Sequence, residues 1–312
     1  MKSVFGVGSK RAAYVALVFL TLIWGMNWIA MKYGLRYGHP VIYNIERTLV
    51  AIALLFAVMA LRRRPLKPES WTAVIVTGFF QTTINFGATT MALASGGAGR
   101  TAVLVFTMPF WTMLIAWPVL NERVRGTQWL AVGFALVGLV LVVEPWNWQG
   151  DLTPKLWATL SGFGWAAGTV TTKYFQRRHK LDILNLIAWQ MLAGILPICL
   201  IPIVWPLPLA EWNAIYVGAL LYTGVIAIGI GFILWTAILA WLPAGTASLN
   251  MFAIPVMALI SSMLIFGERL TATEWLGIAS IGAGLAIISA RAWIASRRGE
   301  REVIEAPAIE GG

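Results

Sequence analysis

The sequence predicts an all-α polytopic membrane protein, in which ten transmembrane helices form two inverted five-helix repeats around a central cavity. Three observations predict this fold class. Hydrophobic residues make up 59% of the 312 residues and charged residues only 12%, which is too little polar surface to cover a soluble globule. The apolar residues come in runs long enough to cross a bilayer. One stretch of the chain also occurs twice with constant spacing.

The apolar runs are each about 20 residues long, the length that a helix needs to cross the hydrocarbon core. They are continuous and do not alternate with a period of two, which disfavours a transmembrane barrel. The predicted helices, in order, cover residues 12–33, 41–61, 71–94, 100–120, 127–143, 154–175, 183–204, 212–235, 244–266 and 274–293.

The repeated stretch runs from Ala98 to Leu139 and returns at a constant offset of 146 residues (255 − 109) without a gap. Residues that are uncommon in apolar runs keep this offset, which makes chance agreement improbable: Pro109/Pro255, Glu122/Glu268, Arg123/Arg269 and Trp129/Trp275. Ten helices in two copies give five helices per copy. Because five is odd, the second copy enters the membrane from the opposite side, so the repeat is predicted to be inverted.

The predicted organisation is a first repeat over residues 1–145, a second repeat over residues 146–293 and a disordered cytoplasmic tail over residues 294–312. The tail is charged, contains Pro and Gly and has no hydrophobic periodicity.

The net charge of +10 comes from basic residues in short loops, so it indicates membrane topology and not nucleic-acid binding. With a cytoplasmic N-terminus, most Lys and Arg residues fall on the cytoplasmic side. We therefore expect a multi-pass protein of the bacterial inner membrane with both termini in the cytoplasm. The residues on that side are Lys2, Lys10, Arg11, Arg62, Arg63, Arg64, Lys67, Arg123, Arg125, Lys173, Arg177, Arg178, Lys180, Arg291, Arg297, Arg298 and Arg301.

Motifs for enzymes and for cofactor or metal binding are absent from the sequence. There is no GxxxxGK[ST], no HExxH and no GxSxG, and Cys199 is the single cysteine. We therefore expect no enzyme activity, no cofactor and no metal.

Polar and aromatic residues inside the predicted helices are the candidate site residues, because polar groups are costly in a bilayer. Trp24, Asn27 and Trp28 share one stripe of the first helix, either as a cavity wall or as a packing stripe in which Asn27 bonds a backbone carbonyl. Gln81 and Asn85 share one face of the third helix. Two neighbouring amides exceed what one interhelical bond requires, which favours a cavity.

Further candidates lie in the helices of both copies. Trp165 forms a stripe in the sixth helix, whereas Trp111 and Asn250 flank the repeated prolines. Pro109 and Pro255 each remove a backbone hydrogen bond, and either a hinge or a static kink would result.

Glu46 and Arg47 are the adjacent acid and base inside a predicted span. Adjacent residues on a helix point about 100° apart, so each should have a separate partner, in an ion-pair network or, for Glu46, as a proton acceptor. The Glu122–Arg123 and Glu268–Arg269 pairs end the fourth and ninth helices on opposite sides. This recurrence favours a structural role such as capping.

Several short motifs occur along both copies: Trp24-Gly25-x-Asn27, Lys32, Arg47, ALASGGAG at 92–99, Pro109, LNER at 120–123, Lys173, LPAGTAS at 242–248, Pro255 and FGER at 266–269. Together they resemble the drug/metabolite transporter superfamily, specifically EamA-type exporters, and within it the bacterial aromatic amino-acid exporters. The resemblance covers about residues 12–293. One departure is that Gly164 precedes Trp165, whereas Gly25 follows Trp24 in the first copy.

The resemblance implies an inner-membrane transporter that exports amino acids, aromatic and other neutral ones, or similar small metabolites by alternating access. Few titratable groups lie in the spans, so we expect facilitated diffusion, with proton antiport through Glu46 as the alternative. A nucleotide-sugar or phosphate-ester carrier is a further alternative, but it should place several Lys or Arg at the cavity. The expected partners are an amino-acid substrate and the lipid bilayer. The oligomeric state stays open, a monomer being one option.

Overall fold

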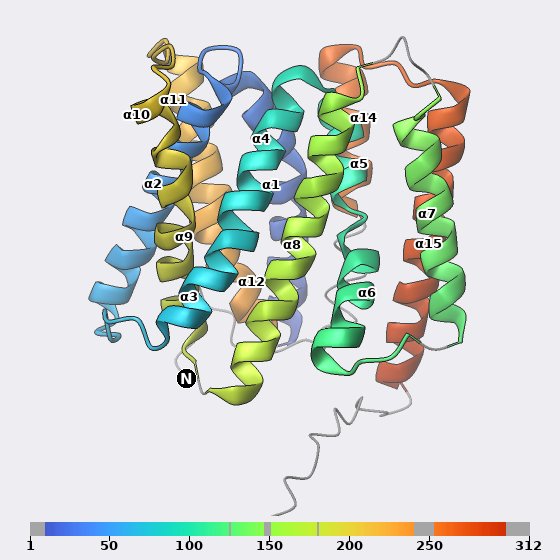
Figure 1. Cartoon of the computed structure of the whole chain (residues 1–312), viewed down its shortest axis with the longest axis horizontal. Coiled ribbons are helices and arrows are strands. Elements are labelled where there is room, and N and C mark those ends of the chain that lie inside the picture. The colour runs from blue at the N-terminus through green and yellow to red at the C-terminus, as the bar shows by residue number, and fades with distance from the viewer. Residues whose placement is uncertain (1–9, 125, 147–150, 180, 240–252, 298–312) are drawn as a thin grey trace, which may run out of the picture.

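In the computed structural model, which describes residues 10–124, 126–146, 151–179, 181–239 and 253–297, the chain is helical and contains no strand. The all-α class is therefore confirmed. The helices run between an upper and a lower end (Figure 1). Within the described residues, six helical stretches are long and apolar enough to cross a membrane: Arg11–Gly34, Pro40–Leu61, Ala98–Leu120, Ile183–Val204, Ala214–Trp235 and Ala272–Arg291. Thr127–Val143 and Ala253–Phe266 are shorter apolar helices.

The first copy closely follows the helix limits that the sequence predicts. Local sequence fixes several starts: Pro40 occupies the first helical turn of the second helix, and the Ser70 hydroxyl accepts from the amide of Ala73, 3.3 Å away. The elements are α1 (Lys10–Gly34), α2 (Pro40–Leu61), α3 (Trp71–Gly78), η2 (Phe79–Ile84), α4 (Asn85–Ser95), α5 (Ala98–Val105), α6 (Met108–Leu120) and α7 (Thr127–Val143).

The second copy is built in the same way. The Asp182 carboxylate caps one helix by accepting from the amide of Leu184, and Asn213 caps another by accepting from Tyr216. The elements are α8 (Thr153–Arg178), α9 (Ile183–Cys199), α10 (Ile201–Val204), α11 (Ala214–Leu221), η3 (Tyr222–Ile230), α12 (Gly231–Leu239), α14 (Ala253–Phe266) and α15 (Ala272–Arg297).

The predicted start of the C-terminal tail differs from this description. The last helix continues to Arg297, past the predicted start of the tail at residue 294, because apolar residues continue after Arg291 through residue 295. Residues 298–312 lie outside the described part of the chain, as do residues 244–252 at the start of the predicted ninth helix.

The two ends of the molecule differ in charge. Residues 35–39, 96–97 and 267–271 join helices at the upper end in Figure 1, and residues 62–70 and 121–124 lie at the lower end. The start of α1 and the end of α15 also lie at the lower end (Figure 1). The lower end carries the basic run Arg62–Arg64, and the last turn of α8 adds Arg177 and Arg178.

Large apolar side chains cover the sides of the molecule between these ends. Leu264 is 81% exposed, and Phe19 and Leu130 are each 59% exposed. Exposure of this kind is unfavourable in water and suits contact with lipid chains.

Helices α7 and α15 pack side by side and run in opposite directions (Figure 1). The hydroxyl of Ser280 donates to the carbonyl of Phe134, 2.7 Å away, and these two residues are separated by the repeat offset of 146. A residue that touches its own counterpart in the other copy must lie near an axis that relates the two copies.

Glycines bring the backbones of these two helices together. Gly138 faces the carbonyl of Gly277, and Gly284 faces the carbonyl of Ala131. Adding 146 to residues 131 and 138 gives residues 277 and 284, so each contact is the counterpart of the other. This is the relation that a two-fold axis between α7 and α15 produces.

Substituting Gly138 by valine should therefore destabilise the protein. A Cβ at this position would lie 2.5 Å from the carbonyl oxygen of Gly277, and overpacking of this kind costs about 1–3 kcal/mol. We expect G138V to lower the unfolding temperature of the detergent-solubilised protein by several degrees. On the same helix, nothing lies within 4 Å of a Cβ added to Gly133, so G133V is the matched control. Equal unfolding temperatures for the two variants would contradict this account of the packing.

Candidate functional site

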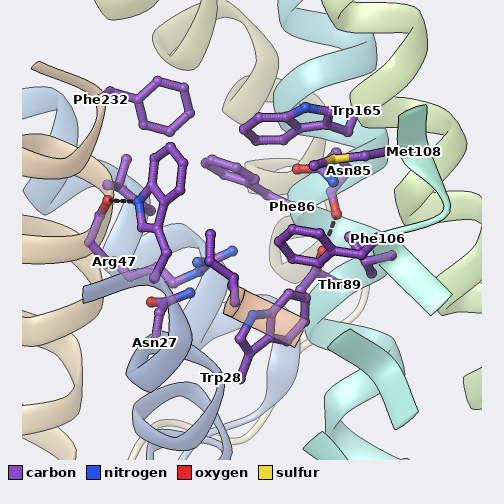
Figure 2. Close-up of a pocket in the computed structure, with 15 residues that line it drawn as sticks. Asn27, Trp28, Arg47, Asn85, Phe86, Thr89, Phe106, Met108, Trp165 and Phe232 are labelled. Atoms are coloured by element: carbon purple, nitrogen blue, oxygen red, sulfur yellow. Dashed lines mark hydrogen bonds between the residues drawn. The ribbon is translucent and has the colours of Figure 1, made fainter. Parts of the chain in front are cut away.

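A cavity lies among the helices of both copies and contains about 670 Å³ of empty space, counted with the part that opens to the outside. Most of its wall is aromatic or aliphatic (Figure 2). The lining residues are Trp24, Asn27, Trp28, Arg47, Asn85, Phe86, Thr89, Val105, Phe106, Met108, Trp165, Ala227, Ile228, Phe232 and Ile254.

Aromatic rings from both copies meet at this cavity. The Phe232 ring packs against two indoles, with its centroid 6.2 Å from Trp24 and 6.0 Å from Trp165. Phe86 is the counterpart of Phe232 at the offset of 146 and also lines the cavity (Figure 2). Such rings offer faces and edges on which an apolar or aromatic group can pack.

Irregular backbone helps to shape the wall. The corresponding segments η2 and η3 are π-helical, a form that is frequent at functional sites. The carbonyl of Ala227 in η3 accepts the indole N–H of Trp24, 2.9 Å away. This bond fixes the ring of Trp24 at the edge of the cavity.

The fourth predicted helix is interrupted beside the cavity. It ends as α5 at Val105 and restarts as α6 at Met108, and Val105 and Phe106 both line the cavity. Pro109 lies in the first turn of α6. An N–H group in the first turn has no partner within the helix, so a proline there removes no helical hydrogen bond. Broken backbone at membrane depth is tolerated where it faces a cavity or other protein.

Arg47 is 2% exposed and reaches the cavity from α2. Its Nε and Nη2 atoms donate to Oδ1 of Asn44, at 3.2 and 3.0 Å, and its guanidinium carbon lies 4.9 Å from the ring centroid of Phe86. Among the described residues, no carboxylate lies within ion-pair distance of it. Glu46 points elsewhere and accepts the hydroxyl of Tyr216, so the two adjacent residues have separate partners.

Two asparagines line the cavity and differ in their hydrogen bonds. The amide nitrogen of Asn27 donates to the sulfur of Met31 at 3.4 Å, whereas its oxygen is buried without a partner in the described part of the chain. The amide nitrogen of Asn85 donates to the carbonyl and hydroxyl oxygens of Ser161, at 3.0 and 2.9 Å. Asn85 therefore holds α4 against α8, and Asn27 keeps a free acceptor.

Gln81, Trp111, Glu46 and Pro255 are predicted site residues that do not line this cavity. Gln81 packs against Gly168 of α8, and the Trp111 indole donates to the hydroxyl of Thr107, 3.2 Å away. Pro255 is buried in α14. The remaining predicted residue, Asn250, lies outside the described residues.

The sequence prediction missed several residues of the wall, namely Phe86, Thr89, Phe106, Met108 and Phe232. One signal was available: Phe86 and Phe232 keep the offset of 146, although they lie outside the stretch where it was first seen. Within the described residues, no group of His, Cys, Asp and Glu side chains could hold a metal ion.

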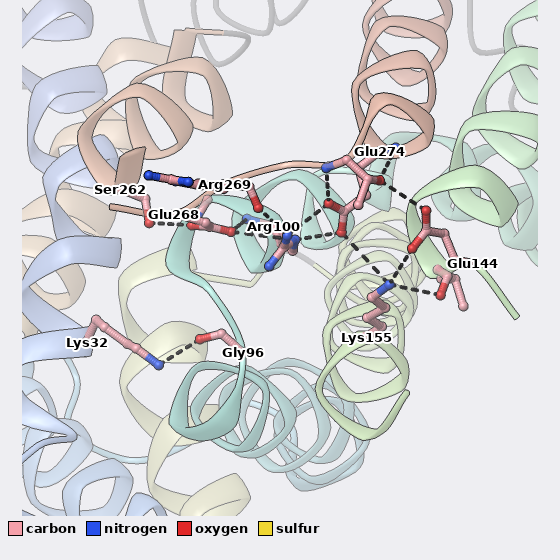
Figure 3. Close-up of polar contacts among 12 residues, drawn as sticks. Lys32, Gly96, Arg100, Glu144, Lys155, Ser262, Glu268, Arg269 and Glu274 are labelled. Carbon is pink, nitrogen blue, oxygen red and sulfur yellow. Dashed lines mark hydrogen bonds and ion pairs between the residues drawn. The ribbon is translucent and has the colours of Figure 1, made fainter. Parts of the chain in front are cut away.

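A polar network joins the helices at the upper end (Figure 3). The Glu268 carboxylate, after α14, accepts from the backbone N–H groups of Gly99 and Arg100, at 3.0 and 3.1 Å, and from the hydroxyl of Ser262. Its negative charge sits at the N-terminus of α5, where the helix dipole favours an anion. A Cβ at Gly97 would collide with this carboxylate, so the glycine makes room for the contact.

Two cations extend this network. Lys32 at the end of α1 donates to the carbonyls of Leu93 and Gly96, which close α4. Arg100 pairs with Glu274 of α15, with 2.6 Å between Nε and the carboxylate. The upper ends of α1, α4, α5, α14 and α15 are thereby tied together (Figure 3).

At the lower end the corresponding acid has different partners. Glu122, the counterpart of Glu268, pairs with Lys173 at 2.7 Å and with Arg177, both on α8. Helix α6 packs against α8 and α7, whereas α5 above it packs against α8, α14 and α1. Glu122 therefore ties α6 to α8, whereas its counterpart Glu268 ties the end of α14 to the start of α5.

Comparison with known families gives two matches to one family model. The model of the EamA-like transporter family matches residues 11–144 and again residues 153–290. The two matches together cover most of the chain.

Curated relatives and a solved structure agree with this match. The "Uncharacterized transporter YoaV" of Bacillus subtilis is 27% identical, over 87% of this chain and 94% of its own length. The "Probable amino-acid metabolite efflux pump" of Salmonella typhimurium is also 27% identical, over 89% and 95%, and the Escherichia coli protein of the same description is 25% identical, over 89% and 95%. A structure described as "Crystal structure of protein" superposes with a TM-score of 0.62 at 18% identity, over 90% of this chain and 99% of that chain, which shows a shared fold.

Proposed function

The chain belongs to the EamA-like transporter family, and from that premise we propose that this membrane transporter exports neutral amino acids, aromatic ones among them, or similar small metabolites. The observation that carries the proposal is the cavity in which rings of both copies converge, Trp24 and Phe86 from the first and Trp165 and Phe232 from the second. Two relatives described as probable amino-acid metabolite efflux pumps support the same substrate class.

The proposed topology has ten membrane crossings in two inverted repeats, residues 1–145 and residues 146–293. The counterpart contacts between α7 and α15 support a two-fold axis in the membrane plane. We place the lower end in the cytoplasm, because cytoplasmic loops carry an excess of Lys and Arg. Both termini then face the cytoplasm, in the inner membrane of a bacterium.

Alternating access follows from this topology. The upper end, which faces outward in the proposed orientation, is held together by Glu268, Arg100 and Lys32. Export requires these contacts to release while the lower end closes. In inverted-repeat transporters such a change rocks one part of the protein against the other around a site near the membrane midplane.

Facilitated diffusion is the mechanism that the described cavity supports best. Arg47 is the one ionisable side chain among the lining residues, and an arginine does not deprotonate in proteins. Proton antiport through Glu46 has less support, because Glu46 bonds Tyr216 away from the cavity wall. A phosphate-ester carrier has less support too, since phosphate recognition commonly uses several cations.

Purified protein in proteoliposomes loaded with labelled phenylalanine, threonine or methionine tests the function. We expect saturable flux down the substrate gradient that an imposed pH gradient does not change. The amino-acid proposal fails if none of the three substrates moves faster than in protein-free vesicles. Flux that rises with a proton gradient would instead support antiport.

A further inference from the structure

We propose that Arg47 and Asn27 form a headgroup site that binds the carboxylate and the ammonium of a free α-amino acid. This inference rests on the proposed function and narrows its substrate class to zwitterions that carry both groups. It is carried by two features of the cavity wall: a buried guanidinium without an acidic partner, and a buried amide oxygen without any partner in the described part of the chain.

The guanidinium of Arg47 has hydrogen-bonding capacity left over. A guanidinium has five N–H donors, and three contacts are made, two with Oδ1 of Asn44 and one with the sulfur of Met31 at 3.6 Å. These contacts leave one N–H on each terminal nitrogen free among the described residues. N–H groups on the two terminal nitrogens of a guanidinium can bind the two oxygens of a carboxylate.

The unpaired charge of Arg47 also favours a ligand that carries a carboxylate. Burying an unpaired charge is costly, and buried charges are normally paired. Here the groups around the guanidinium are neutral: the amide of Asn44, the sulfur of Met31 and the ring of Phe86. An anion that enters the cavity would supply the missing partner.

Asn27 supplies the complementary group. Its amide oxygen can only accept hydrogen bonds, and an ammonium can only donate them. The amide nitrogen of Asn27 contacts the same Met31 sulfur that Arg47 contacts, at 3.4 Å, so the two groups are neighbours (Figure 2). In an α-amino acid a single carbon separates the carboxylate from the ammonium, which suits two adjacent protein groups.

The direction of the substrate side chain then follows. With its headgroup on Arg47 and Asn27, an amino acid extends toward the rings that line the rest of the cavity, since Phe86 lies directly beside the guanidinium. The site therefore separates recognition of the headgroup from recognition of the side chain. It predicts a preference for free amino acids over amines or acids that carry the same ring.

A series of substrate analogues tests whether the headgroup is recognised separately from the side chain. In the proteoliposome assay we would compare phenylalanine with phenethylamine, which lacks the carboxylate, and with 3-phenylpropionate, which lacks the ammonium. Each analogue should compete with labelled phenylalanine about tenfold or more weakly than unlabelled phenylalanine does. If phenylalanine is transported and both analogues compete as well as it does, the headgroup site is refuted while the proposed function stands. If phenylalanine is not transported at all, the proposed function itself fails.

Variants test whether Arg47 binds the carboxylate and Asn27 binds the ammonium. R47Q should lose the preference for phenylalanine over phenethylamine, R47K should keep most of it, and N27L should lose the preference over 3-phenylpropionate. R64Q is the matched control, because Arg64 is an exposed loop residue paired with Asp182. A purely structural role for Arg47 predicts that R47Q lowers stability and all three affinities together, and that result would overturn the proposal. An unfolding temperature for each variant separates these outcomes.

Discussion

Replacing Glu268 by alanine is expected to release the upper end and to raise outside labelling of the cavity by more than about 100-fold, because removing one partner of a buried ionic contact costs about 3–5 kcal/mol. The Glu268 carboxylate is 5% exposed, and it accepts from two backbone N–H groups of α5 while Arg100 lies 3.9 Å away. Alanine would leave these donors without a partner, and water could provide one only if the helices separate.

The measurement uses a cysteine reporter in the cavity. Cys199 is first replaced by alanine, and Val105, which lines the cavity, is replaced by cysteine. Right-side-out vesicles are then treated with a membrane-impermeant thiol reagent. The rate of labelling should rise strongly with E268A and more modestly with E268Q, because glutamine keeps one acceptor oxygen.

Glu122 provides the matched control for this experiment, since it is the counterpart of Glu268 at the opposite end. Its carboxylate is 36% exposed and pairs with Lys173 and Arg177 of α8. E122A should therefore leave outside labelling unchanged. If E122A and E268A raise labelling equally, then general loosening of the fold is the cause, and the network in Figure 3 is not what closes the upper end.

The helical framework was predictable because it depends on summed properties of long segments. Continuous apolar runs and their lengths are sufficient to locate most helices, and α7 has the predicted limits of residues 127 and 143. The interruption between α5 and α6 was harder to predict from the sequence. Pro109 signalled a disturbance nearby, but the break lies before it, because a proline is tolerated in the first turn of a new helix.

The candidate site was predictable in part. Trp24, Asn27, Trp28, Asn85 and Trp165 were singled out from their spacing on helices, and all five line the cavity. Spacing alone could not distinguish Asn85, whose amide nitrogen bonds Ser161, from Asn27, whose oxygen is free. That difference depends on which neighbouring helix each residue meets.

The contact partner of Glu268 could not be predicted from the sequence either. Its recurrence as the counterpart of Glu122 favoured a structural task such as capping, and Glu268 does bond the N-terminus of a helix. However, that helix is α5 of the first copy, more than 160 residues away in sequence, as the separation of 169 residues between Gly99 and Glu268 shows. A sequence repeat gives the correspondence of two residues but not the copy whose atoms each one contacts.

The second large effect that we expect is a loss of substrate preference when the counterpart phenylalanines of the cavity wall are truncated. Phe86 and Phe232 are counterparts, and Phe232 contacts the indoles of both Trp24 and Trp165. Truncating both to alanine should lower the transport preference for phenylalanine over alanine about 100-fold, since each lost ring contact is worth about 1 kcal/mol and lost apolar contact adds to it. The measurement is the ratio of kcat/KM for the two substrates in proteoliposomes.

The ratio is informative because both substrates carry the same headgroup. Phe86 also lies beside Arg47, so its removal could disturb headgroup binding, but that disturbance affects phenylalanine and alanine alike and cancels. The exposed Phe79 and Phe134 give a control double variant, F79A/F134A, which removes two rings from the outer surface. If that control changes the ratio as much as F86A/F232A does, the rings act through the fold and not through the substrate. If neither double variant changes it, substrate side chains do not pack on these rings, and the aromatic wall serves only to hold α4 and α12 in place.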